Sequence, residues 1–172
     1  CRGLISAELR VRLLDQDQHA AFSPVLRSSA WMLTHALASL VDEDGEVAIA
    51  GFADAVREPD AAAAEVARSL APPGETLGRG GASGWLPGRS AEDLALRLSY
   101  GPTVNVSALA AGDPSSETTV VPAVARARID LHLVPDQDPE QVVHQLRKHL
   151  DIHGFGEVEL DVETMLWPAP GV

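Results

Sequence analysis

The chain has 172 residues, which is enough for one domain with a substantial core and too few for two domains of ordinary size. Acidic side chains outnumber basic ones by 25 to 13, the formal net charge is -12, and no basic stripe is set apart, so neither nucleic acid nor an anionic membrane is expected as a partner. An apolar fraction of 45% suits a soluble globule, and the longest near-apolar segment, 30–41, is far too short to cross a membrane.

The first element in chain order is a strand with one buried face. Apolar residues at Ile5, Ala7, Leu9, Val11 and Leu13 alternate with polar ones. Ser28 or Ser29 can then cap a helix that runs through Asp42. Apolar residues recur at helical spacing in this segment, at Ala30, Leu33, Leu37, Leu40 and Val41.

Residues 44–100 read as an insertion. Within it, the stretch EVAIAGF at 46–52 predicts a second short strand, and 61–70 predicts a helix. The stretch 71–90 is rich in glycine and proline without a period and predicts a flexible loop. One more helix is predicted over 91–99.

The second half predicts two strands, a helix and a last strand. The helix begins at Pro139 after Asp138 and ends at Gly154. The residues expected to face inward are Val104, Val106 and Ala108 in the first of these strands, Ala125, Ala127, Ile129, Leu131 and Leu133 in the second, Val142, Val143, Leu146 and Leu150 in the helix, and Val158, Leu160 and Val162 in the last strand.

With the insertion set aside, the order is strand, helix, strand, strand, helix, strand. This order predicts an α+β, ferredoxin-like βαββαβ two-layer sandwich, with one antiparallel sheet and both helices on one face. The insertion lies between the first helix and the second core strand.

Four segments carry a resemblance to a known family: CRGLISAELRVRLLDQDQH, LASLVDEDGEVAIAGFADAV, PTVNVSALAAG and ETTVVPAVARARIDLHLVPDQDPEQV. They are similar to successive segments of the lid, or dimerisation, domain of carnosinase-like dipeptidases, in the dinuclear-zinc family that also contains aminoacylase and succinyl-diaminopimelate desuccinylase. The similarity runs from Cys1 to about Val162 and fails mainly over 56–100.

The resemblance implies a two-domain hydrolase whose catalytic domain holds two zinc ions. Paired zinc needs a bridging carboxylate and several converging ligands, and this sequence shows no such cluster. The six histidines are scattered, and His149 and His153 at the end of a helix are interpreted as solvated side chains favoured by the helix dipole. The sequence therefore predicts no metal site here, and a fragment that is inactive without its catalytic domain.

The resemblance assigns a catalytic role to His19. The family's lid has a D-x-H-S-G loop after the first strand, whose histidine reaches into the partner subunit's site and stabilises the oxyanion of the peptide carbonyl. Asp17 and His19 match this loop, whereas Ala20 and Ala21 stand at the serine and glycine positions. An ordinary exposed loop histidine remains the alternative.

The resemblance also implies substrate contacts from Asn105, Thr119 and His132. In the family, an arginine binds the terminal carboxylate of the substrate, and His132 stands at that position. A histidine replaces the two-pronged guanidinium by a single ring donor whose charge depends on pH. For Asn105, an amide bonded within the sheet is an equal alternative.

Cys1 is the only cysteine, which fits a reducing compartment, and the expected location is the cytoplasm. A chain that begins with Cys is most simply cut from a longer protein, although an N-terminal cysteine is also the nucleophile of self-processed amidohydrolases. The expected partners are a second lid in a homodimer, with Trp31 and Met32 at the interface, the chain's own catalytic domain, and a small peptide or N-acyl amino acid substrate. Two other hypotheses stay open: the lid of a relative with altered substrate, and a free-standing ferredoxin-like binding or oligomerisation module.

Overall fold

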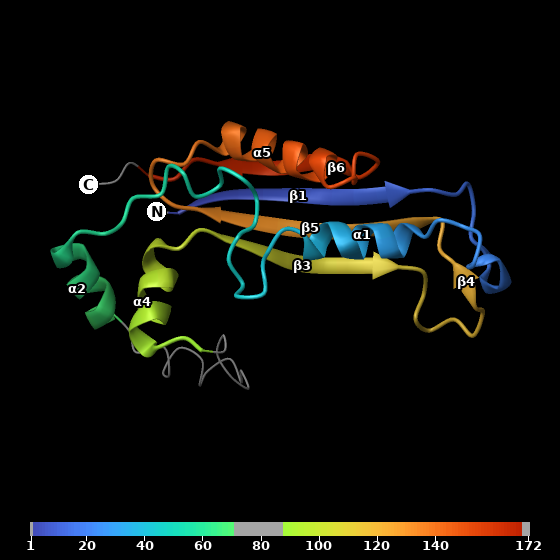
Figure 1. Ribbon diagram of the computed structural model, residues 1–172, viewed down its shortest axis with the longest axis horizontal. Helices are drawn as coiled ribbons and strands as arrows, with labels where there is room; N and C mark the ends of the chain where they lie inside the picture. Colours follow the sequence, from blue (N-terminus) through green and yellow to red (C-terminus); the bar gives the residue numbers. More distant parts are fainter. Residues whose placement is uncertain (1, 71–87, 170–172) are drawn as a thin grey trace.

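The computed structural model describes residues 2–70 and 88–169, and its core is a four-stranded sheet covered by two helices (Figure 1). The core elements are β1 (Gly3–Arg12), α1 (Ser29–Ala38), β3 (Thr103–Ala111), β5 (Val124–Leu133), α5 (Pro139–Ile152) and β6 (Glu159–Leu166). The strand order is β3-β5-β1-β6, and every neighbouring pair is antiparallel. The predicted ferredoxin-like α+β plan is confirmed.

The sheet has one buried face and one open face. In β1 and β5 every second residue is buried, and the register pairs Ile5 with Leu131 and Ala7 with Ile129, so the buried sets of the two strands share one side. Leu33 of α1 and Leu146 of α5 belong to the same apolar cluster. Both helices therefore cover this side, and the polar residues of the strands lie on the open side.

The helix ends follow local chemistry that the sequence predicts. The Ser28 hydroxyl accepts a hydrogen bond from the Trp31 amide at 3.3 Å, and the Asp138 side chain accepts from the Glu140 amide at 2.9 Å. Gly154, with φ of 83°, follows the end of α5. The predicted extension of α1 through Asp42 is wrong, because the helix ends at Ala38, although Leu40 beyond it is still buried.

The predicted strand at 46–52 is also wrong. The Asp42 carboxylate accepts hydrogen bonds from the amides of Asp44 (3.0 Å) and Glu46 (2.8 Å), which folds a tight turn and leaves one isolated bridge between Val41 and Val47. The apolar residues of this stretch contribute to the core from a turn instead of a strand. Ile49 and Phe52 are buried in the main apolar cluster without being paired in the sheet.

The inward face predicted for β3 is wrong in its second half. Val104 packs against the core, whereas Val106 is 44% exposed and Ala108 is exposed. The pairing of β3 with β5 shifts by one residue between Val106 and Ala108, so strict alternation fails there. Because β3 lies at the edge of the sheet, its outer backbone has no neighbouring strand in the described chain.

The insertion contributes two helices, α2 (Ala61–Leu70) and α4 (Ala91–Tyr100), which contact each other beside one end of the sheet (Figure 1). Arg68 forms an ion pair with Glu92 at 2.7 Å between these helices. Both helices were expected from the sequence. Most of the flexible loop predicted over 71–90 lies outside the described residues.

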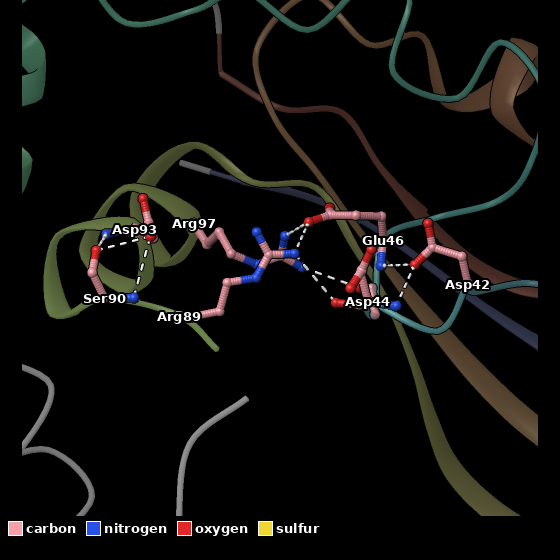
Figure 2. Close-up of polar contacts among 8 residues, drawn as sticks. Asp42, Asp44, Glu46, Arg89, Ser90, Asp93 and Arg97 are labelled. Carbon is pink, nitrogen blue, oxygen red and sulfur yellow. Dashed lines mark hydrogen bonds and ion pairs between the residues drawn. The ribbon is translucent and has the colours of Figure 1, made fainter. Parts of the chain in front are cut away.

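A polar cluster ties α4 to the turn at 42–46 (Figure 2). The Glu46 carboxylate accepts hydrogen bonds from Arg89 at 2.6 Å and from Arg97, and Arg97 also donates to the Gly45 carbonyl at 3.1 Å. Arg2 donates to the carbonyls of Arg97 (3.0 Å) and Gly101 (2.8 Å). Arginine side chains thus hold α4 against this turn and against Arg2, the residue before β1.

Candidate functional site

His19 lies in a small second sheet beside the end of β1 and the beginning of β5. There β2 (Gln18–His19) pairs with β4 (Val120–Val121), and the 3-10 turn η1 (Ala20–Phe22) follows. The His19 side chain is exposed, and its Nδ1 accepts a hydrogen bond from the Ala21 amide at 3.1 Å. Since Nδ1 is the acceptor, the neutral ring carries its proton on Nε2. Nε2–H is therefore free to donate to an external acceptor.

The loop around His19 is held on both sides. Asp17 accepts a hydrogen bond from the Ala123 amide at 2.8 Å, and the Ala20 amide donates to the Thr119 carbonyl at 3.1 Å. The structure thus brings His19 and Thr119 together. Ala21 has no positive φ, so this loop conformation does not require a glycine there.

His132 and Asn105 lie on the open face of the main sheet. His132 stands between Leu4 and Thr103 in the cross-strand register. Asn105 is one row along, opposite Asp130. The two residues are therefore near neighbours on one polar surface.

Asp130 is a feature of this surface to which the sequence analysis assigned no role. Its carboxylate accepts a hydrogen bond from the Ser6 hydroxyl at 2.8 Å. The pKa of Asp130 lies below its ordinary value, mainly because of this hydrogen bond, with further contributions from the Ser107 hydroxyl and the nearby His132 ring. The polar side of the β5 alternation was the only sequence signal for it.

The two groups of predicted site residues lie at opposite ends of the sheet. Thr119 and His19 adjoin the beginning of β5 at Val124, whereas His132 is eight residues further along the same strand. At about 3.3 Å per residue, these ends are roughly 26 Å apart. One copy of the chain therefore does not bring His19 and His132 into a single site.

Of the two histidines at the end of α5, only His153 matches the expectation of a solvated ring. His149 is not solvated: it is 2% exposed, and its Nε2 lies 3.0 Å from the Ser39 hydroxyl. His153 does lie at the surface, where its Nδ1 donates to the His149 carbonyl oxygen at 2.8 Å. The helix end that was expected to expose both rings packs the first against α1.

The described residues do not fit a metal centre. Within 2–70 and 88–169, no three His, Cys, Asp or Glu side chains are grouped as a bound metal would require. No helix in these ranges is long and apolar enough to cross a membrane.

Comparison with protein families identifies the class of this chain. The model of the peptidase dimerisation domain of the M20 family matches residues 2–156. The chain belongs to this family, whose members are hydrolases. Comparison with curated protein sequences gives no match.

Three solved structures show the same fold. An M20 family metallo-carboxypeptidase from Sulfolobus solfataricus, Sso-CP2, has 33% sequence identity and a TM-score of 0.82, with 96% of this chain and 38% of that chain covered. Human carnosine dipeptidase 1 has 22% identity and a TM-score of 0.85, with 98% and 38% covered. The di-peptidase Dug1p from Saccharomyces cerevisiae has 21% identity and a TM-score of 0.79, with 94% and 35% covered. The chain spans less than two fifths of the length of these proteins.

Proposed function

We propose that this chain is the dimerisation and substrate-capping lid of a cytoplasmic zinc-dependent hydrolase that cleaves peptide or amide bonds of small substrates. The observation that carries the proposal is His19, whose Nδ1 is occupied by the Ala21 amide and whose Nε2–H is left exposed. A donor of this kind suits the stabilisation of a developing oxyanion. The chain by itself is inactive in this proposal.

The two zinc ions implied by the family resemblance would be held outside the described residues, since these do not fit a metal centre. Bound zinc supplies an activated water and polarises a carbonyl in hydrolases of this kind. The part played by this chain is different. It binds and orients the substrate and donates one hydrogen bond, from His19, to the carbonyl oxygen as charge develops on it.

The separation of the two residue groups supports a dimeric arrangement. Because His19 and Thr119 lie at the opposite end of the sheet from His132 and Asn105, roughly 20 to 26 Å away along the strands, a single lid supplies one group to each of two sites. In a pair of lids, His19 and Thr119 of one copy would complete the site that His132 and Asn105 of the other copy approach. The proposal therefore requires a homodimer with shared sites.

Two exposed features suit a contact between copies. The outer edge of β3 has no neighbouring strand in the described chain, and it carries exposed Val106 and Leu109. Trp31 on the adjoining helix α1 is 67% exposed, and Met32 beside it is half-buried. Aromatic and methionine side chains are enriched in interface cores.

The roles proposed for the three substrate-contacting residues follow from their chemistry. His132 binds the terminal carboxylate of a small peptide or N-acyl amino acid, and Asn105 and Thr119 supply hydrogen bonds. A single imidazole binds a carboxylate less tightly than a bidentate guanidinium does. The substrate preference is therefore expected to differ from that of relatives with arginine at this position.

The test is hydrolysis by the full-length protein that contains this chain. With zinc added, it should cleave dipeptides or N-acyl amino acids, and the 172-residue chain by itself should not. Deletion of residues 2–169 from the full-length protein should abolish the activity even where the metal content is kept. Full activity without these residues would refute a lid function.

A further inference from the structure

The open face of the sheet carries an ionised carboxylate next to the proposed substrate contacts. Asp130 lies in the row between Ser6 and Asn105, and the next row holds His132. All these side chains share the face opposite the helices. Directly opposite residues in such rows have Cβ atoms about 5 Å apart.

This carboxylate keeps its charge across the neutral range. The hydrogen bond from Ser6 at 2.8 Å favours the ionised form, and so does the Ser107 hydroxyl, so the pKa of Asp130 lies below its ordinary value. A hydroxyl orients the carboxylate without neutralising it. The negative charge is therefore available to a further partner.

No cation of the described chain takes up that charge. The nearest arginine on the same strand, Arg128, forms its ion pair with Glu163 of β6 at 2.9 Å. Within residues 2–70 and 88–169, no Lys, Arg or His nitrogen forms an ion pair with Asp130. His132 and Arg128 contribute electrostatic effects from nearby without such a contact.

We propose that Asp130 binds a positively charged side chain of the substrate, on the residue whose terminal carboxylate contacts His132. This rests on the proposed function and adds the substrate class: peptides with a basic terminal residue. Residues i and i+2 of a strand are about 6.6 Å apart, and the four-carbon stem of a lysine spans a distance of this order. One terminal lysine can thus place its carboxylate at His132 and its ammonium at Asp130.

The experiment compares two dipeptides, alanyl-lysine and alanyl-norleucine, which differ only in the ammonium group at the end of the second residue's side chain. In the full-length protein, kcat/KM should be about tenfold higher for alanyl-lysine, since a hydrogen-bonded charge in a closed site contributes a factor of this order. The D130N variant should lower this ratio toward one. The D161N variant, at an exposed aspartate elsewhere on the same face, should keep it.

A variant with the opposite charge at position 130 gives a second test, because a residue with only a structural role would not reverse the substrate preference. The D130K variant should favour alanyl-glutamate over alanyl-lysine. A wild-type ratio near one overturns the inference without any variant, and so does a high ratio that D130N leaves unchanged. Either result, obtained with measurable hydrolysis, leaves the proposed function in place. If no dipeptide is hydrolysed, the proposed function is wrong and this inference fails with it.

Discussion

His149 Nε2 lies 3.0 Å from Ser39 Oγ, where the end of α5 meets the end of α1. Ser39 Oγ is also 2.7 Å from the Ala36 carbonyl oxygen, which can only accept a hydrogen bond. The single hydroxyl proton therefore goes to Ala36, and His149 donates from Nε2. Nδ1 of the neutral ring then has no proton, and it is buried without a partner in the described residues.

The contact between His149 and Ser39 predicts a loss of stability in acid. The pKa of His149 is lowered, first by burial and then by the His153 ring stacked on it at 4.1 Å. Lys148 and His144 line the same hollow and add no compensating negative charge, and Asp54 lies near Gly51 on its other wall. Below about pH 6.5, His149 takes up a proton in the unfolded chain but not in the folded chain. The free energy of unfolding therefore has its full value above about pH 6.5 and decreases below it.

The measurement is urea unfolding between pH 7.5 and pH 5. The equilibrium constant for unfolding should rise by up to tenfold per pH unit below about 6.5 from this group alone. The H149Q variant keeps a hydrogen-bond donor for Ser39 and cannot titrate, so its equilibrium constant for unfolding should change less with pH. The H144Q variant removes an exposed histidine of the same helix and should follow the wild type. Equal slopes for all three proteins would contradict the prediction.

The cluster around Glu46 predicts a salt-sensitive attachment of α4. Glu46 accepts from both Arg89 and Arg97, and all three side chains are partly exposed, so each pair contributes at most about 1 kcal/mol. In E46Q, amide hydrogen exchange of α4 should increase by about fivefold while β5 stays protected. Added salt should reproduce part of the effect in the wild type. The E58Q variant, at an exposed glutamate without an ion pair in the described chain, is the control, and equal effects of both variants would exclude a specific attachment.

His19 should act on the transition state. In the full-length protein, H19A should lower kcat by about a hundredfold with little change in KM, because the donated hydrogen bond strengthens only as the oxyanion forms. H144A, at an exposed histidine of α5, should have no effect on either constant. Steady-state kinetics on the best dipeptide substrate check this, and wild-type kinetics for H19A would show that the ring is an ordinary surface group.

His132 should act on substrate binding instead. H132A should raise KM, and H132R should lower it for dipeptides with a free terminal carboxylate, because guanidinium adds a bidentate contact. KM values of the wild type, H132A and H132R on one dipeptide decide this. An unchanged KM in H132A would remove His132 from the site.

The edge of β3 and the outer side of α1 should form the dimer contact. Light scattering should give a dimer for the wild type at micromolar concentration, and V106K and W31A should shift it toward the monomer, since a buried lysine and a lost aromatic contact both weaken an interface. V66K, at a valine of α2 that is 54% exposed, should leave the dimer intact. A wild-type monomer at high concentration would refute the proposed pairing.

Several parts of the fold could be predicted from local sequence patterns. The alternation of Ile5 to Val11 and of Ala125 to Leu133 places one buried face on each strand, because successive side chains of a strand point to opposite sides. Ser28, Asp138 and Gly154 mark helix ends through side-chain and backbone chemistry confined to one turn. These features depend on neighbours in the chain, so local patterns are enough to predict them.

Other features depended on partners far away in the chain. The apolar pattern of 46–52 could not separate a paired strand from a turn that inserts Ile49 and Phe52 into the core. The burial of His149 depends on Ser39, 110 residues away, and the position of Ala108 opposite Arg128 of the open face depends on a shift in the pairing with β5. A side chain's environment is set by whichever distant element packs on it, and periodicity carries no information about that partner.

The same distinction holds for the candidate site. The sequence determined the residue types His19, Asn105, Thr119 and His132 and, through the family resemblance, a role to test for each. The folded chain shows that His19 and Thr119 lie at one end of the sheet while His132 and Asn105 share the other end with Asp130, which no local pattern predicts. Strand pairing and register bring such residues together or hold them roughly 26 Å apart, because an extended strand of ten residues separates its two ends by that order of distance.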